Sequence, residues 1–306
     1  MKVFVLAPQE DWICDRLVAE WYHNFSDITT TNILKADVIW LLAGWCWNHI
    51  HPDLLRSKKL VVTEHHIVPE KFTSHKLKNF MIRDQFVNVY HAPNEKTARF
   101  LRKLTKKPIR VISYWLNSDM WQAFSKETAR KDLKISQSDF CIGSFQRDTE
   151  GHDLKTPKLE KGPDLFCDFV EKAASDKENL HVILGGWRRQ YVINRLKSKN
   201  IKYSLFEKAP IDLVKKMYAA CDLYVVSSRY EGGPQAIIEA SAMKIPIIST
   251  DVGIASSILS GRCITDLSEF FIPASEIDYN YENVKKIDIK KIGKEYISMF
   301  EGLLNE

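Results

Sequence analysis

The chain has 306 residues, of which 45% are hydrophobic and 27% charged, and its net charge is +5. These fractions exclude disorder, collagen and coiled coil for the chain as a whole, and the length predicts about two domains. Residues 1–118 hold 17 Lys/Arg against 11 Asp/Glu, a balance of +6, whereas the remainder has a balance of −1. A protein that coats nucleic acid is usually more basic overall, so no nucleic-acid partner is expected.

The apolar segments are too short for targeting or for crossing a membrane. The first, Val3–Ala7, is shorter than a signal-peptide core, and the longest, Val38–Trp47, is about half of a spanning helix. The six cysteines form no C-x-x-C pair, which favours free thiols in a reducing compartment. We expect a cytoplasmic protein, soluble or peripheral at the inner face of the membrane.

Short β-branched runs alternate along the chain with helical patterns. The predicted strands are 2–6, 37–42, 60–63, 86–90, 109–113, 140–144, 181–184, 202–205, 223–227 and 246–249. The predicted helices are 11–24, 94–104, 162–174, 211–220, 234–243 and a long, Lys-rich one over 281–304.

This alternation predicts an α/β protein, because strands that are apolar on both faces belong to parallel sheets covered by helices. Ten strands divided five and five predict two Rossmann-like sheets. The pattern breaks near Asn117–Asp119. We therefore expect a first domain over 1–118, a second over 119–280, and a C-terminal helix over 281–306.

Several catalytic signatures are missing from the sequence. There is no G-x-G-x-x-G, P-loop, H-E-x-x-H or G-x-S-x-G, which disfavours dehydrogenases, P-loop NTPases, zincins and serine hydrolases. Glu64-His65-His66 and His49-x-His51 contain metal-ligating residue types, but adjacent histidines on a strand point to opposite faces. We predict no metal site.

Residues 222–253 are the most informative stretch: a buried strand, a glycine turn, a helix and a second buried strand. Gly232-Gly233 lets the backbone approach a ligand closely, and Pro234 suits the start of a helix. The amides at that helix start attract an electron-rich group. Glu231 in the turn and Glu239 two helical turns later can face one cleft at the carboxyl ends of the strands.

With this segment, the sequence resembles the retaining GT-B-fold glycosyltransferases of family 4. Glu231 and Glu239 have the spacing of their E-x7-E motif, and the similarity extends from about Phe140 to Gly253. Ile142–Arg147, Lys161-Gly162 and Val182–Gly186 resemble the earlier strands and turns of the same domain. The resemblance implies two Rossmann-like domains facing across a cleft, with a C-terminal helix that can return to the first domain.

The resemblance also implies roles for the second domain. Arg147 and Lys161 would hold the diphosphate of a nucleoside-diphosphate sugar, and Glu239 would accept hydrogen bonds from the ribose. Glu231 and the turn would hold the transferred sugar, and the segment after the eighth strand would contact the base. The resemblance assigns the sugar to Gly232, Gly233, Pro234 and Gln235, and the base to Phe206 and Lys208.

The first domain matches the family less closely. His65 follows a predicted strand, at the place where the family has a histidine that faces the donor sugar. His66 is the alternative for this role. Trp45 and Trp47 are candidates for stacking on an acceptor sugar, although buried Trp packing also explains such clusters. The family's Gly-rich first loop is replaced here by Gln9-Glu10-Asp11-Trp12, and its E-G-F-G motif by E-G-G-P.

The predicted activity is hexosyl transfer from a nucleoside-diphosphate sugar to an acceptor hydroxyl with retention, without a metal or other cofactor. The predicted setting is surface glycan, lipopolysaccharide or glycolipid synthesis. A GT-B-fold sugar-nucleotide epimerase and a non-catalytic nucleotide-sugar-binding protein remain alternatives. Residues 71–110 hold eleven Lys/Arg against two acidic residues, which predicts an anionic partner such as a membrane surface.

Overall fold

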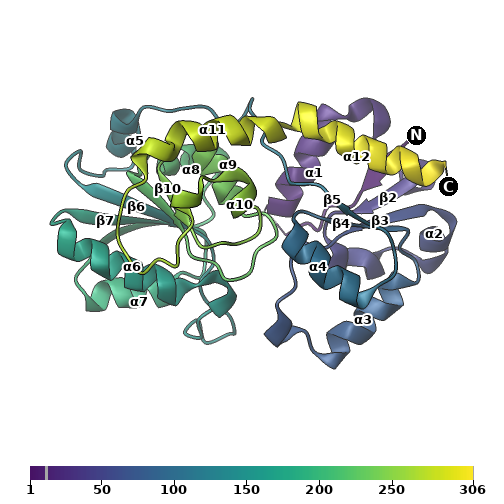
Figure 1. The fold of residues 1–306 in the computed structure, drawn as a ribbon, viewed down its shortest axis with the longest axis horizontal. Helices are drawn as coiled ribbons and strands as arrows, with labels where there is room; N and C mark the ends of the chain where they lie inside the picture. The colour runs from purple at the N-terminus through teal and green to yellow at the C-terminus, as the bar shows by residue number, and fades with distance from the viewer. Residues whose placement is uncertain (11–12, 306) are drawn as a thin grey trace. The chain divides into compact units, whose positions relative to one another are not determined.

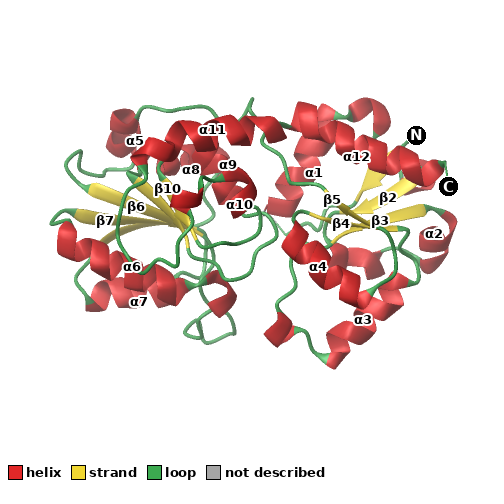
Figure 2. Ribbon diagram, viewed as in Figure 1, coloured by secondary structure: helices red, strands yellow, loops and turns green. Residues whose placement is uncertain are grey.

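The computed structural model describes residues 1–10 and 13–305, and these form two five-stranded parallel sheets. Figure 1 traces the chain through them, and Figure 2 separates strands from the surrounding helices. The chain divides into two compact units, unit 1 of Met1–Asn117 with Ile287–Glu306 and unit 2 of Ser118–Lys286. The predicted fold class and all ten predicted strands are confirmed. No helix in the described ranges is long and apolar enough to cross a membrane.

The sheet of unit 1 has the order β1-β2-β3-β4-β5. Its strands are β1 (Val3–Val5), β2 (Val38–Leu41), β3 (Lys59–Thr63), β4 (Val89–Ala92) and β5 (Ile109–Val111). After α1 (Ile13–Asn24) the chain makes a parallel bridge at the outer edge of β1, where Thr29 pairs with Val3, before it crosses to β2. Because the chain passes around this edge, α1 can cover one face of the sheet and later helices the other, although the strands follow one another in chain order.

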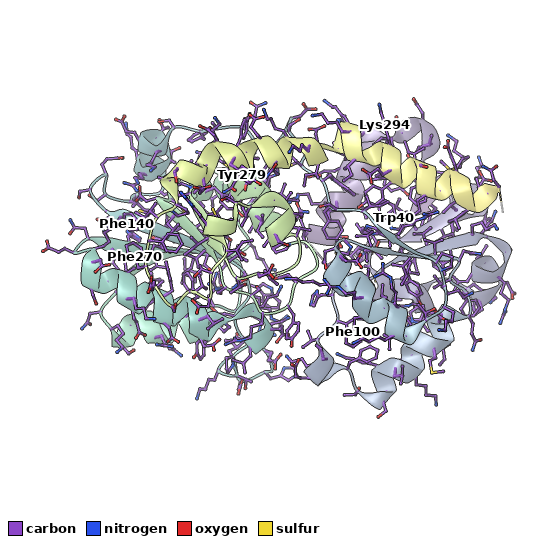
Figure 3. All side chains as sticks on the ribbon, in the orientation of Figure 1. Trp40, Phe100, Phe140, Phe270, Tyr279 and Lys294 are labelled. Atoms are coloured by element: carbon purple, nitrogen blue, oxygen red, sulfur yellow. The ribbon has the colours of Figure 1, made fainter. Side chains whose placement is uncertain are left out.

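One face of this sheet carries α1 and α12 (Ile289–Leu304). Trp40 points from β2 to this face, where it packs edge-on against Trp21 and lies 5.2 Å, between ring centroids, from Tyr296 of α12. Figure 3 shows Trp40 beneath α12. The opposite face has a separate apolar core with side chains from α2 (Pro52–Ser57), α3 (Ser74–Asp84) and α4 (Glu95–Leu104).

A buried polar network ties α12 to the sheet of unit 1. His91 on β4 is fully buried; its Nδ1 lies 2.9 Å from Thr63 Oγ1 and its Nε2 lies 2.8 Å from the carbonyl oxygen of Ile112. The Tyr296 hydroxyl donates to the carbonyl oxygen of Ser113 at 3.0 Å. Because burial disfavours the imidazolium, the pKa of His91 falls to about 4. His91 is therefore neutral near pH 7.

The sheet of unit 2 has the order β10-β9-β6-β7-β8. Its strands are β6 (Phe140–Phe145), β7 (Leu180–Gly185), β8 (Lys202–Phe206), β9 (Leu223–Val226) and β10 (Ile247–Ser249). Its helices are α5 (Lys126–Asp132), α6 (Pro163–Asp176), α7 (Gln190–Ser198), α8 (Ile211–Ala220), α9 (Gln235–Ala242), α10 (Ala255–Ile258) and α11 (Ile277–Val284). The strand order reverses at β6, so the segments after β6 and β9 begin side by side.

Some predicted boundaries were wrong. The strand over 86–90 begins only at Val89, because Phe86 and Val87 first pack into the core after α3 ends. The single helix over 281–304 is two helices, and the break has a cause: Asp288 caps α12 through the amide of Lys290 and bridges Leu116. The predicted helix over 11–24 is described from Ile13; its residues 11–12 lie outside the described ranges, as does residue 306.

Candidate functional site

Polar and glycine-rich segments follow every strand of unit 2 at the same edge of its sheet. All five strands are parallel, so their carboxyl ends lie together. The predicted donor-site residues of this unit all come from these segments or from the helix that follows β9. The strand order therefore brings together residues from 146 to 239 that are far apart in sequence.

Gly162 fixes the position of Lys161. The glycine has a left-handed φ of 58°, and a Cβ on it would lie 1.9 Å from the carbonyl oxygen of Ser227. A side chain at 162 would push the two segments apart. The carbonyl oxygen of Lys161 accepts hydrogen bonds from Gln146 Nε2 at 2.8 Å and Ser227 Oγ at 3.1 Å. The ends of β6 and β9 thus hold the Lys161 backbone from two sides.

The Lys161 ammonium forms an ion pair and hydrogen bond with the Glu231 carboxylate. Their side chains are 19% and 14% exposed, so both are largely withdrawn from water. The Ser228 hydroxyl lies 3.0 Å from Glu231 Oε1 and 3.2 Å from Gln146 Oε1. Sequence analysis placed a cation and a carboxylate at this site but did not predict that they pair.

The turn Gly232–Pro234 leads from this ion pair into α9. Pro234 caps the helix rather than starting its first turn, since α9 begins at Gln235. Gly253, after β10, has a φ of 55°, and a Cβ there would lie 2.5 Å from the carbonyl oxygen of Gly232. The close approach of the two backbones explains why residue 253 is a glycine. It leaves the first amides of α9 at the carboxyl edge of the sheet.

Glu239 lies on α9 and is 6% exposed. Its Oε2 accepts a hydrogen bond of 2.7 Å from the hydroxyl of Tyr218 on α8. Burial, and then the nearby Glu239, raise the pKa of Tyr218 well above its usual value, so the phenol keeps its proton and acts as the donor. Tyr218 orients the carboxylate that the sequence assigned to the ribose, and no motif pointed to it.

Arg147 follows β6, but it is not bonded to the Lys161–Glu231 pair. Its Nε donates to the carbonyl oxygen of Thr149 at 2.8 Å, and its guanidinium lies 5.5 Å from the ring centre of Trp187. Trp187 follows β7 and is 46% exposed. The predicted contact of Arg147 with a diphosphate stays a prediction. Phe206 ends β8 half-buried and Lys208 is exposed beside it, at the same edge of the sheet.

A fully buried ion pair supports the segment that carries Arg147. Arg189 Nε donates to Asp148 Oδ2 at 2.8 Å, and both side chains are at most 1% exposed. Arg189 Nη1 also donates to the carbonyl oxygens of Ser144 and Gly185, at the ends of β6 and β7. One guanidinium therefore fixes both strand ends beneath the site. Buried charges so paired are costly to separate.

In unit 1, both ring nitrogens of His65 have partners. Nε2 lies 2.7 Å from the carbonyl oxygen of Leu42, and Nδ1 is hydrogen-bonded to the Tyr114 hydroxyl. Because a carbonyl oxygen only accepts, Nε2 carries the proton and Nδ1 accepts from Tyr114. The ring is held in one orientation. A contact of His65, or of the half-buried His66, with a donor sugar remains a prediction.

The two tryptophans proposed for an acceptor differ in their surroundings. Trp45 is 48% exposed, donates from Nε1 to Glu10 Oε1 at 3.0 Å, and lies 5.5 Å from the His65 ring. Trp47 is half-buried and stacks on Phe86 with ring centroids 6.2 Å apart. Core packing therefore accounts for Trp47, and Trp45 is the better placed of the two for a ligand.

Sequence reasoning missed Gln146, Ser228, Tyr218 and the Asp148–Arg189 pair. Polar residues directly after a buried strand were a usable signal for Gln146 and Ser228. Tyr218 and Arg189 gave no local signal. In residues 1–10 and 13–305 no group of three or more His, Cys, Asp and Glu is arranged to hold a metal ion. The metal-free site remains a prediction.

Comparison with known proteins gives related chains. Residues 155–262, about a third of the chain, match the family described as Glycosyl transferases group 1. The chain is 26% identical over 223 residues to the lipopolysaccharide core biosynthesis mannosyltransferase LpsB of Rhizobium meliloti, covering 68% of this chain and 57% of that protein. It is 21% identical over 286 residues to the O-antigen chain mannosyltransferase RfbU of Salmonella typhimurium, covering 85% and 78%. The chain spans about half the length of the first curated relatives that it matches.

Solved structures agree on the fold. Anabaena Alr3699/HepE, solved in complex with UDP and glucose, has a TM-score of 0.77 at 13% identity, with 98% of this chain and 99% of that one covered. Sucrose-phosphate synthase of Thermosynechococcus elongatus has a TM-score of 0.69 at 15% identity, with 95% and 78% covered. The architecture is that of GT-B glycosyltransferases: two α/β units, each with a parallel Rossmann-like sheet.

Proposed function

We propose that this protein is a glycosyltransferase that moves a hexose from a nucleoside-diphosphate sugar to an acceptor hydroxyl with retention. The observation that carries the proposal is the Lys161–Glu231 pair beside the Gly232–Pro234 turn. It offers a cation and a hydrogen-bond acceptor at one point. A sugar diphosphate needs both, because its phosphates are anionic and its sugar donates from hydroxyl groups.

Each of the other residues binds a different part of the donor. A lysine ammonium has three protons, so Lys161 can bind Glu231 and a phosphate oxygen together. Arg147 is the second cation for the diphosphate, and Glu239, oriented by Tyr218, accepts from the ribose hydroxyls. Phe206 and Lys208 contact the base. The amides of Gly232 to Gln235 and the Glu231 carboxylate hold the sugar.

The chemistry exchanges one carbon–oxygen bond for another. The bond from the anomeric carbon to the diphosphate oxygen breaks, and a bond to the acceptor oxygen forms on the same face. The departing phosphate oxygen takes the acceptor proton, so no protein nucleophile is needed. Negative charge grows on the diphosphate as the bond breaks, and Lys161, Arg147 and the amides at the start of α9 stabilise it without a metal ion.

The named activities of the relatives guide the choice of substrates. Two are mannosyltransferases of lipopolysaccharide core and O-antigen synthesis, and they support a mannose-type donor and a surface-glycan or glycolipid acceptor. Our proposal puts this acceptor on the cytoplasmic side of the membrane. The chain needs no further cofactor under this proposal.

A panel of UDP-, GDP-, ADP- and dTDP-linked hexoses tests the donor site. The matching donor should raise the melting temperature by mass action and should be turned over on adding a glycolipid acceptor. EDTA should leave turnover unchanged. Loss of turnover in EDTA, restored by magnesium or manganese, would contradict the metal-free mechanism.

Glu239→Gln removes the charge that strengthens the ribose contact. Because a hydrogen bond to a charged group contributes about 1.5–3 kcal/mol, donor affinity should fall about tenfold or more. Glu178→Gln is the matched control, since Glu178 is exposed before β7 at the opposite edge of the sheet. Calorimetry that finds equal donor affinity in both variants would reject the ribose assignment. Donor conversion without any acceptor would favour an epimerase instead.

A further inference from the structure

A serine, a histidine and an aspartate are hydrogen-bonded in series on the sheet of unit 2. Ser204 Oγ lies 2.9 Å from His181 Nε2, and His181 Nδ1 lies 2.9 Å from Asp139 Oδ2. Asp139 comes directly before β6, His181 lies near the start of β7, and Ser204 lies on β8. These three strands are neighbours in the sheet, which brings together residues that are far apart in sequence.

The register of the sheet sets these contacts. Across β7 and β8, His181 pairs with Lys202 and Ile183 pairs with Ser204. Side chains two residues apart on a strand point to the same face, so His181, Lys202 and Ser204 share one face of the sheet. His181 and Asp139 lie at the amino ends of their strands, whereas the candidate donor site lies at the carboxyl ends. The Ser–His–Asp group is therefore separate from the donor site.

The partners of His181 fix the positions of its protons. Burial alone would raise the pKa of Asp139, but hydrogen bonds from Lys202 and His181 bring this pKa below its usual value, so the group is a carboxylate near pH 7. Because a carboxylate only accepts, His181 carries its proton on Nδ1. Burial lowers the pKa of His181, although the hydrogen bond with Asp139 opposes this, and the ring is neutral near pH 7. Its Nε2 therefore accepts from the Ser204 hydroxyl.

The surroundings of the three residues suit a nucleophilic serine. Asp139 and His181 are 9% and 2% exposed, whereas Ser204 is half-buried on a strand at the edge of the sheet. Among the described strands, β8 pairs with β7 alone, so the amides on its outer side have no strand partner. Such amides can donate to an oxygen atom on which negative charge develops. The exposed Lys202 ammonium lies 2.6 Å from Asp139 Oδ2 and holds the carboxylate in place.

We propose that Ser204, His181 and Asp139 form a second reactive site, which takes an acyl group from a small activated ester. The Ser204 oxygen bonds to the carbonyl carbon while His181 Nε2 takes the serine proton, and the bond from that carbon to the ester oxygen then breaks. The leaving oxygen receives the proton. Water attacks the acyl-serine by the same route, which releases the carboxylic acid and restores the hydroxyl. Asp139 keeps the imidazole in the accepting tautomer and stabilises the imidazolium.

A fluorophosphonate probe tests the serine directly, because an activated serine oxygen bonds to its phosphorus and displaces fluoride. In the full chain, peptide mass spectrometry should find the label on Ser204, and the label should be absent when the chain is first unfolded in concentrated urea. Ser204→Ala should lose the label. Ser198→Ala is the matched control and should keep it, because Ser198 is exposed and its hydroxyl donates to the carbonyl oxygen of Arg195 at 2.8 Å. The probe needs neither sugar donor nor acceptor, so this test is independent of the proposed sugar transfer.

Hydrolysis of p-nitrophenyl acetate gives a second measurement. After subtraction of the uncatalysed rate, Ser204→Ala and His181→Gln should release p-nitrophenolate about 10²-fold or more slowly than wild type, since a positioned general base contributes about 10²–10⁴-fold. Circular dichroism melts show whether each variant is folded. If His181→Gln fails to fold, the labelling of wild type and its loss in Ser204→Ala still decide the question, because that change removes one oxygen atom.

Three results would overturn the inference. The first is a folded wild type that takes up no label at Ser204, and the second is labelling of Ser198 as fast as that of Ser204. The third is a folded His181→Gln variant that is labelled and hydrolyses the ester at wild-type rates. Any of these would leave the three residues as a structural network that joins β6, β7 and β8.

Discussion

Replacing Lys161 with methionine separates the structural and catalytic parts of the candidate site. The side chain keeps its length and loses its charge, which leaves the Glu231 carboxylate, 14% exposed, without its cation. Breaking a fully buried ion pair costs about 3–5 kcal/mol, and these partly solvated groups should cost about 2 kcal/mol. For a unit of this size the melting temperature should fall by about 4–8 °C.

The same change should affect sugar transfer far more than donor binding. If Lys161 stabilises charge that develops on the leaving diphosphate, kcat should fall about 10²–10³-fold while donor Kd changes by less than tenfold. The assays are calorimetry for stability, donor titration for Kd and steady-state turnover for kcat. Lys161→Arg keeps the charge and should recover part of the rate.

The double variant Lys161→Met/Glu231→Gln decides between the two effects. It also removes the carboxylate charge that lost its cation, so stability should return to within about 1 kcal/mol of wild type, while turnover stays low. A double variant as unstable as the single one would refute the ion-pair argument. A Lys161→Met enzyme with wild-type kcat would refute the role in leaving-group stabilisation.

Two further predictions concern stability. Because the folded pKa of His91 is lowered from 6.5 to about 4, the unfolded chain binds this proton more tightly, and stability present above pH 6.5 should be lost as pH falls towards 4. Urea unfolding followed by tryptophan emission should show about 2–3 kcal/mol less stability at pH 4.5 than at pH 7.5, beyond any loss of stability in His91→Gln. An equal loss in wild type and His91→Gln would contradict this prediction. Gly162→Ala should destabilise the protein by about 3 kcal/mol or more, because the added Cβ would meet the carbonyl oxygen of Ser227. Gly302→Ala is the control: its Cβ would enter open space, and the change should stabilise α12 by about 0.5–1 kcal/mol. A melting temperature that rises in both glycine variants would contradict the backbone constraint at Gly162.

The pattern of the sequence was enough to predict the strands and the class of fold. Buried strands such as Val38–Leu41 and Leu223–Val226 are continuous β-branched and apolar runs, and that signal lies within a few residues. The glycine turn between β9 and α9 was also visible, because its residues are consecutive. Shorter helices with weak periodicity, including α2, α5 and α7, were not predicted.

The last helix shows where local pattern fails. Its Lys-rich periodicity runs through the break at 285–288, where the amide of Leu116 bonds the carbonyl oxygen of Ile287. That partner is more than 150 residues away. The same non-local packing makes α12 part of unit 1, where Tyr296 meets Trp40 and His91.

For the candidate site, the sequence alone determined which residue types gather at the carboxyl ends of the strands. The tertiary structure decided which of them touch. Lys161 follows β6 and Glu231 follows β9, 70 residues later, and they pair because the strand order sets β6 beside β9. Tyr218 reaches Glu239, and Arg83 becomes a buried partner of Glu64, for the same kind of reason. Spacing along a chain fixes secondary structure, whereas side-chain pairing depends on sheet order and helix packing, which arise from the hydrophobic collapse of the whole unit.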